Sequence, residues 1–133
     1  MYFFTTDEHY DHANIIKYCN RPYSSVEDMN VDIIQRHNIM VGRHDTTIHA
    51  VDFAFGKTYK SIYDKFISKL NGEHIFLQGS HDSWLSNHKN VIHEMKIDNQ
   101  HIVICHYAMS VWPKSHYGSW MLFGHSHGRH QTD

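Results

Sequence analysis

The sequence predicts an α/β fold in which helices flank a mixed β-sheet sandwich. Short β-prone segments alternate with segments of helical hydrophobic period in the first half of the chain, and strands dominate the second half. Hydrophobic residues make up 41% of the 133 residues and charged residues 20%, which is enough apolar material for one packed core. We therefore expect residues 1–133 to form a single domain.

Six strands are expected from runs of apolar, aromatic and β-branched residues. They cover residues 2–6, 46–51, 74–78, 91–97, 101–105 and 119–123. The fourth and fifth runs are separated only by Asp98-Asn99-Gln100, a turn-forming sequence. These two strands are therefore predicted to form a β-hairpin.

Two helices are expected before the second strand. Asp11 is the expected N-cap of a helix that runs to about Cys19. Ser24 and Glu27 have the spacing of a capping box, which predicts the start of a longer helix. The apolar face of that helix is expected to carry Val26, Met29, Ile33, Ile34 and Met40.

A third helix is predicted over residues 59–70, where aromatic and aliphatic residues recur at helical spacing and Asn71-Gly72 follows. We expect this stripe to pack in the core. It consists of Tyr59, Ile62, Tyr63, Phe66, Ile67 and Leu70. Four later aromatic residues could stack on a nucleobase, although packing is the simpler expectation. They are Tyr107, Trp112, Tyr117 and Trp120.

Composition excludes several classes of protein. The formal net charge of -2 gives no basic footprint for coating nucleic acid, although bound metal ions could still attract a nucleotide. No apolar stretch is long enough for a membrane span, and the N-terminus lacks the basic region of a signal peptide. Cys19 and Cys105 are expected to be reduced thiols, so a cytoplasmic location is the expectation.

Histidine is unusually frequent, with 15 copies, and many lie in polar clusters that directly follow predicted strands. Ligand-binding residues of α/β sheets gather at this edge, where loops are held by a rigid scaffold. The side chains of residues i and i+2 in extended backbone point the same way. Both side chains of an Asp-x-His or His-x-His pair could therefore bind one ligand on the same side of the chain. The clusters are Asp7-Glu8-His9, Asp52, Gly79-Ser80-His81-Asp82, His106 and Gly124-His125-Ser126-His127-Gly128.

The order of these clusters resembles the calcineurin-like metallophosphoesterase family. The resemblance covers residues 3–128, and residues 6–16 also resemble the first motif of its small bacterial and phage members. It implies a phosphoesterase with two metal ions bridged by Asp52. The first ion would be bound by Asp7, His9, Asp52 and His127. The second would be bound by Asp52, Ser80, His106 and His125.

The resemblance also implies that His81 contacts the phosphate and protonates the leaving group, with Asp82 orienting it. Two positions depart from the family pattern. Ser80 stands where the family usually has Asn, which predicts a weaker second metal, and Val51 stands where Gly usually precedes the bridging Asp. Val51 is expected to crowd the site or shift the loop. Only six residues follow His127, whereas members of the family commonly continue further, so we expect either a short sheet edge or a longer natural chain.

Other interpretations of these residues are weaker. Gly124-His125-Ser126-His127-Gly128 also matches the nucleophile elbow of α/β-hydrolases, but that fold needs an acid and a histidine further along the chain. Cys105 and His106 are strand neighbours that point to opposite faces, so Cys105 is expected in the core rather than in a catalytic dyad. A structural zinc protein also fits poorly, because structural zinc sites favour Cys and His ligands without carboxylates.

We therefore predict a metal-dependent phosphoesterase that acts on phosphodiesters or nucleotides. Its mixed imidazole and carboxylate ligands suit Mn, Fe, Zn, Co or Ni better than Mg or Ca. The expected partners are a small phosphate ester, a nucleotide or nucleic-acid ends, with no membrane. The alternative is a catalytically weak or inactive metal-binding scaffold of the same fold. The presence of both His81 and Asp82 favours the enzyme.

Overall fold

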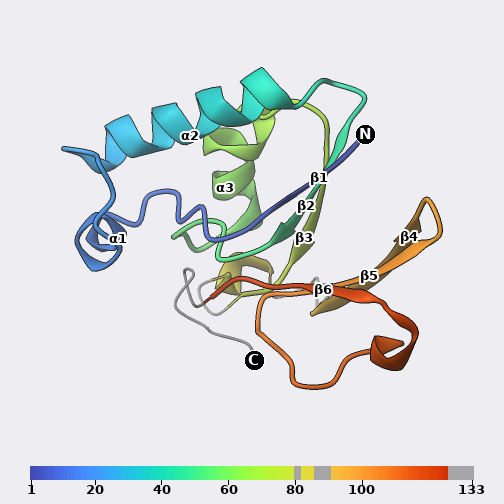
Figure 1. The fold of residues 1–133 in the computed structure, drawn as a ribbon. Coiled ribbons are helices and arrows are strands. Elements are labelled where there is room, and N and C mark those ends of the chain that lie inside the picture. The colour runs from blue at the N-terminus through green and yellow to red at the C-terminus, as the bar shows by residue number, and fades with distance from the viewer. Residues whose placement is uncertain (80–81, 86–90, 126–133) are drawn as a thin grey trace.

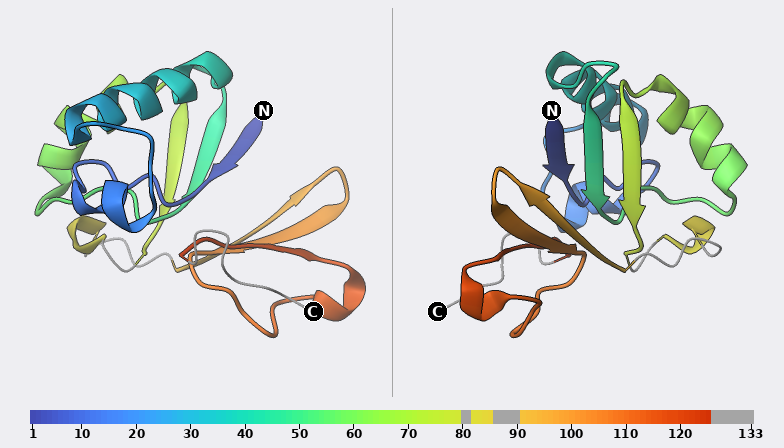
Figure 2. Two further views of the ribbon diagram at one scale, coloured as in Figure 1. Left: turned by 60° about the vertical axis from the view of Figure 1, so that its left-hand side comes forward. Right: turned by 90° about the vertical axis from the view of Figure 1, so that its right-hand side faces the viewer.

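The computed structural model describes residues 1–79, 82–85 and 91–125 of the chain. Two three-stranded sheets lie face to face, with helices on the outer face of the first sheet (Figures 1 and 2). The expected mixed sheet sandwich flanked by helices is confirmed. The helices are α1 (Asn14–Tyr18), α2 (Val26–Met40) and α3 (Tyr59–Lys65), and short 3-10 turns cover Ile67–Lys69, Ser83–Leu85 and Ser115–Tyr117.

The first sheet is entirely parallel, in the order β1 (Tyr2–Thr5), β2 (Thr46–Ala50), β3 (Glu73–Leu77). The second sheet is mixed. Its strands β4 (Ile92–Ile97) and β5 (Gln100–Cys105) are antiparallel, and β6 (Trp120–Leu122) pairs in parallel with β5. Asp98 and Asn99 form the two-residue turn between β4 and β5, both with positive φ, which confirms the predicted hairpin.

The first sheet separates two hydrophobic cores, because successive side chains of a strand point to opposite faces. Ile48 and Ala50 of β2 pack against Ile102 and Ile104 of the second sheet. The other core lies on the helix side and contains Tyr10, Val51, Phe53, Ile62, Phe66, Ile67, Leu70, Trp84 and Leu85. Both faces of the first sheet are therefore covered.

The helix starts differ from the prediction. Ser25, one residue after the expected cap, accepts a hydrogen bond from the Asp28 backbone at 3.1 Å and begins α2. Asp11 is not the N-cap of α1, because it has a positive φ of 59° and α1 follows Ala13. The Asp11 side chain instead accepts a hydrogen bond from Asn30 Nδ2 at 2.9 Å, which ties the first loop to α2.

The predicted third helix is interrupted at Phe66, where φ is -127°, and the chain continues as a 3-10 turn. Ile62, Phe66, Ile67 and Leu70 are buried, as expected of a core stripe, whereas Tyr59 and Tyr63 are exposed. Met40 at the end of α2 is also exposed rather than part of its packed face.

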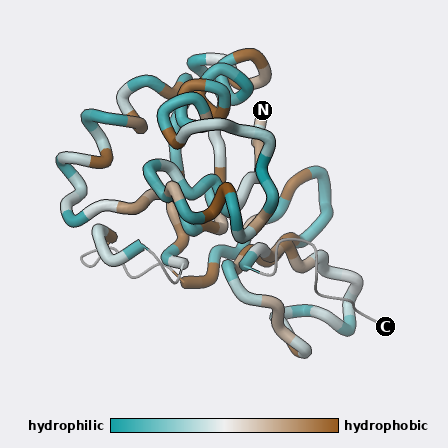
Figure 3. The backbone as a smooth tube through the Cα atoms, turned by 90° about the vertical axis from the view of Figure 1, so that its left-hand side faces the viewer, coloured by the Kyte–Doolittle hydropathy of each residue, from teal (hydrophilic) through white to brown (hydrophobic). Residues whose placement is uncertain are grey.

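Apolar and polar residues alternate along the chain instead of gathering in one long apolar segment (Figure 3). In the part of the chain that the structure describes, no helix has the length and apolar character needed to cross a bilayer.

Candidate metal centre

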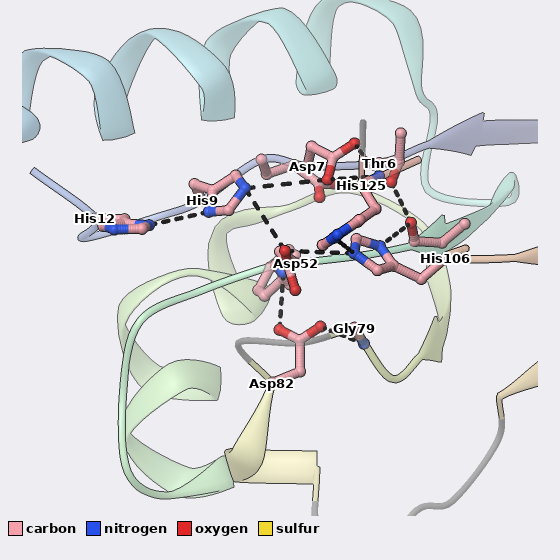
Figure 4. A network of polar contacts seen from close by, with 12 residues as sticks. Thr6, Asp7, His9, His12, Asp52, Gly79, Asp82, His106 and His125 are labelled. Atoms are coloured by element: carbon pink, nitrogen blue, oxygen red, sulfur yellow. Dashed lines mark hydrogen bonds and ion pairs between the residues drawn. The ribbon is translucent and has the colours of Figure 1, made fainter. Parts of the chain in front are cut away.

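Five of the predicted site residues converge at one edge of the two sheets (Figure 4). They come from the carboxyl ends of strands in both sheets. Asp7 and His9 follow β1, Asp52 follows β2, His106 follows β5 directly, and His125 follows β6. All are buried except His125. Residues more than a hundred positions apart in the sequence therefore lie within reach of one another.

These side chains form two overlapping triads that share Asp52. Asp7, His9 and Asp52 make one triad, and Asp52, His106 and His125 make the other. In each triad one possible ligand atom per residue lies within 4.8 Å of the others. Asp52 Oδ2 is 3.8 Å from His9 Nε2 and 3.4 Å from His106 Nε2. The shared carboxylate is therefore placed to contact two cations at once.

His106 presents the lone pair of Nε2 to the centre. Its Nδ1 lies 3.1 Å from the Ala50 carbonyl oxygen, which can only accept, so Nδ1 carries the proton. Nε2 then faces Asp52 Oδ2 and, at 3.1 Å, His125 Nδ1. A ligating histidine commonly donates its other N–H to a carbonyl in this way.

The pKa of His106 also indicates that the cluster favours a positive charge. Burial alone would lower the pKa of His106, but the hydrogen bonds to Asp52 and to the Ala50 carbonyl outweigh burial and raise it. The buried carboxylates thus favour a cation beside this ring, which either a proton or a metal ion can supply. The set of donor atoms, carboxylates with imidazoles, fits a divalent transition metal.

The loop that carries Asp7 and His9 is not extended, so the expected geometric reason for their convergence is wrong. Both residues have positive φ, 59° for Asp7 and 57° for His9, and His125 has 67°. These left-handed conformations are uncommon for residues other than glycine and cluster at functional sites. The two side chains meet because of this turn.

Two glycines allow the loops to approach the ligands closely. A Cβ at position 124 would lie 2.6 Å from Asp7 Oδ2, and a Cβ at position 79 would collide with the Val51 carbonyl and with Asp52 Oδ1. Only glycine fits such contacts with neighbouring backbone and ligand atoms. After Gly124, the His125 backbone N–H donates to both carboxylate oxygens of Asp7, at 3.2 and 3.1 Å.

Arg21 holds the loop that carries Asp7 and His9 from the other side, a role that sequence reasoning missed. Its guanidinium donates to the carbonyl oxygens of Asp7 at 2.5 Å and Glu8 at 2.7 Å. Arg21 lies 14 residues from Asp7 and outside every motif, so no local pattern identifies it. The Nδ1 atom of His12 lies 3.0 Å from His9 Nδ1.

Asp82 ties together the loops that follow β2 and β3. Its carboxylate accepts hydrogen bonds from the backbone of Phe53 at 2.8 Å, the backbone of Gly79 at 2.9 Å and the Trp84 indole at 3.1 Å. Burial raises the pKa of Asp82, and these three donors offset only part of that effect. Asp82 therefore positions the segment on either side of the predicted catalytic histidine.

Three predicted site residues, Ser80, His81 and His127, lie outside the residues that the structure describes.

Val51, expected to crowd the site, instead packs its side chain in the helix-side core. Tyr107 is 40% exposed, and its ring lies 4.9 Å from those of His106 and His125. Tyr117 and Trp120, expected to pack, are mostly exposed. Cys105 is buried and, like Cys19, free, as expected.

A second polar network, also missed by sequence reasoning, lies on the helix side of the first sheet. Glu8 Oε1 lies 2.7 Å from His49 Nδ1, and His49 Nε2 lies 2.9 Å from His74 Nδ1. Glu8 stands between Asp7 and His9 in the sequence, but its side chain belongs to this network. Burial, with neighbouring His49 and His37, lowers the pKa of His74 to about 4.

The fold and this cluster define a mixed α/β protein with a candidate metal site made of two overlapping aspartate–histidine triads. The chain belongs to the same family as the uncharacterized protein MJ1445 of Methanocaldococcus jannaschii. The two are 31% identical over 125 residues, which cover 94% of this chain and 68% of MJ1445. No family model matches the chain.

A solved structure supports the fold. The chain is similar to AQ665 from Aquifex aeolicus, whose crystal structure is titled as that of a protein of unknown function, with a TM-score of 0.65 and 23% identity. The match covers 80% of this chain and 60% of AQ665. The chain thus spans less than two thirds of the length of that structure.

The Asp82→Asn variant should lose roughly 3 kcal/mol of unfolding free energy. An amide offers only one acceptor oxygen, so its NH₂ group would face at least one of the donors on Phe53, Gly79 and Trp84. Urea titration measures the loss. Asp64→Asn, at a mostly exposed ion pair with Lys60, is the matched control and should change stability little. Equal effects of the two substitutions would contradict this role for Asp82.

Stability should also fall in acid because of His74. The unfolded chain accepts a proton near the ordinary pKa of 6.5, whereas the folded protein resists it until about pH 4. The contribution of neutral His74 is therefore complete above pH 6.5 and is lost as the pH falls toward 4, by roughly 2–3 kcal/mol. Urea titrations between pH 4 and 7 should show this slope. His74→Gln should flatten it, while His44→Gln, at an exposed position, should leave it unchanged.

Proposed function

We propose that this protein is a metal-dependent phosphoesterase of the calcineurin-like metallophosphoesterase superfamily. Its substrates would be phosphodiesters, nucleotides or nucleic-acid ends, and residues 1–133 would act as one domain. The observation that carries the proposal is the pair of buried triads sharing Asp52. A structural site for a single ion would need neither the shared carboxylate nor the second set of histidines.

The described residues would supply three ligands for each of two ions. Asp7, His9 and Asp52 would hold one, and Asp52, His106 and His125 the other. The resemblance adds His127 to the first set and Ser80 to the second. In the sequence Ser80 directly follows Gly79 and His127 comes three residues after Gly124, and these two glycines lie in close contact with Asp52 and Asp7. The native ions would be Mn, Fe, Zn, Co or Ni.

Two divalent ions held by these residues would supply charge neutralisation for a phosphoryl group and would lower the pKa of a bound water. The protein side chains must then orient the ester and deliver a proton. Hydrolysis forms one P–O bond from water and breaks the P–O bond to the leaving group, whose oxygen needs a proton. We assign that proton to His81, as the resemblance implies.

The described neighbours of His81 suit such a role. Gly79 and Asp82 flank the segment, and the Asp82 carboxylate accepts the Gly79 backbone N–H at 2.9 Å. The same carboxylate accepts the backbone N–H of Phe53, one residue after Asp52, and so joins Gly79 to the segment that carries Asp52. Asp82 is thus a positioning residue for the acid, in keeping with the role that the resemblance gives it.

The experiment combines metal content with turnover of p-nitrophenyl phosphate and bis(p-nitrophenyl) phosphate. Wild-type protein should bind two divalent ions and hydrolyse at least one ester. His81→Ala should keep both ions and lose about 10²–10⁴-fold in kcat. Asp52→Ala should lose both ions and activity. His44→Ala, an exposed histidine, is the matched control and should behave as wild type.

Ser80→Asn tests the weaker half of the centre. An amide oxygen reaches further than a hydroxyl, so the variant should bind its second ion more tightly than wild type. Wild-type protein that binds two ions yet hydrolyses neither ester nor any nucleotide would favour the inactive scaffold. An active protein whose rate is unchanged in His81→Ala would refute the assigned acid.

A further inference from the structure

The turn that follows β1 brings the side chain of His12 against the candidate metal ligand His9. Their Nδ1 atoms are 3.0 Å apart, and the centroids of the two rings are 5.1 Å apart. The distance between the nitrogens is that of a hydrogen bond, in which one nitrogen donates and the other accepts. His12 belongs to neither of the two triads, so its role has to follow from this contact.

His9 directs its other ring nitrogen, Nε2, toward the candidate metal centre. Nε2 lies 3.8 Å from Asp52 Oδ2 and 4.0 Å from Asp7 Oδ1. Figure 4 shows the His9 ring between these two carboxylates on one side and His12 on the other. A neutral imidazole that binds an ion through Nε2 carries its hydrogen on Nδ1. His9 is then the donor in the contact with His12, and His12 Nδ1 is the acceptor.

Backbone contacts fix the position of His12. Its N–H donates to the His9 carbonyl at 3.1 Å, and its own carbonyl accepts from the Ile15 N–H at 3.2 Å, at the start of α1. Asp11, directly before it, donates its N–H to Asn30 Oδ1 at 3.0 Å and accepts from Asn30 Nδ2 at 2.9 Å. The segment around His12 is therefore attached to both α1 and α2.

Phe55 stacks on the ring of His12. The two centroids are 5.5 Å apart, and the ring planes are inclined by 25°. Phe55 follows Asp52 by three residues, and its N–H donates to the Tyr10 carbonyl at 2.8 Å. Because Phe55 is 61% exposed, core packing does not account for its position. Its stacking instead restricts the rotation of the His12 side chain.

His106 has a comparable arrangement. Its Nδ1 donates to the Ala50 carbonyl, which leaves Nε2 directed toward Asp52. Such a partner fixes the tautomer and the orientation of a ligating imidazole, and its loss commonly weakens metal binding about 10- to 100-fold. For His9 the partner is a side chain, so it can be removed by a substitution that leaves the ligand itself in place.

We propose that His12 is a positioning residue for the ion that Asp7, His9 and Asp52 would hold. It would accept the Nδ1–H of His9 and so keep His9 Nε2 directed at that ion. This role rests on the metal centre of the function proposed above, and it is independent of whether any ester is hydrolysed.

Nuclear magnetic resonance of the Zn²⁺-loaded protein with ¹⁵N-labelled histidine detects this hydrogen bond. Zn²⁺ is diamagnetic, so signals of nitrogens beside the ion stay observable. His9 Nδ1 should carry a hydrogen, and a scalar coupling across the N–H···N bond should join it to an unprotonated Nδ1 of His12. A His9 Nδ1 without a hydrogen would overturn the proposal.

Calorimetric titration with Mn²⁺ measures the effect on metal binding. His12→Leu removes the acceptor and should weaken one of the two ions about 10- to 100-fold. His12→Asn should restore its affinity to within about threefold of wild type, because the amide oxygen can take the place of Nδ1. His12→Gln is polar but places its amide at the position of Nε2, so it should weaken that ion as His12→Leu does. His44→Leu, at an exposed position, is the matched control and should bind as wild type.

Circular dichroism verifies that each variant is folded, and His12→Gln serves if His12→Leu is not. Anomalous scattering at limiting Mn²⁺ then identifies the affected ion. In His12→Leu, the peak beside Asp7 and His9 should lose occupancy. The peak beside His106 and His125 should keep it.

His12→Leu and His12→Gln that bind both ions as tightly as wild type would overturn the role of His12, even in a protein that hydrolyses esters. Wild-type protein that binds both ions without hydrolysing any ester would refute the phosphoesterase alone. Selective loss of one ion in His12→Leu would still support the role of His12 in that case.

Discussion

The carboxylate of Asp52 is buried between imidazoles and a second carboxylate, and the rest of the site follows from that placement. Asp52 is 3% exposed, His9 and His106 approach it from two sides, and Asp7 belongs to the same cluster. Burying a charge without a partner costs on the order of several kcal/mol. Two cations shared through one carboxylate, as proposed above, would relieve this cost, and a proton on His106, whose pKa the Asp52 carboxylate helps to raise, would relieve part of it.

The scaffold holds this arrangement with backbone contacts rather than with packing alone. Left-handed residues at Asp7 and His9 each cost about 1–3 kcal/mol and persist only where neighbours hold them. Arg21 binds the Asp7 and Glu8 carbonyls, and Gly124 lets the His125 N–H reach Asp7. The same short loop thus sends Asp7 and His9 to the candidate metal centre and Glu8 to the hydrogen-bonded network with His49 and His74.

The sequence predicted the strands and the position of the site well, because runs of apolar and β-branched residues, and polar residues directly after them, are local signals. Asp7, Asp52 and His106 could be placed at one sheet edge on that basis. The left-handed loop, the contacts of Arg21 and the Glu8–His49 pair could not be predicted, because they depend on which segments meet in space. The alternation of Thr47, Ile48 and His49 indicates a strand with one polar face, but not that α2 covers that face. Ser80, His81 and His127 remain predictions.

Anomalous diffraction from crystals of the protein loaded with Mn²⁺ tests the central claim most directly, because it locates each ion without reference to activity. The account predicts two peaks about 3.5–4 Å apart on either side of Asp52. One should lie beside Asp7 and His9, and the other beside His106 and His125. A single peak, or peaks that do not share Asp52, would contradict the account.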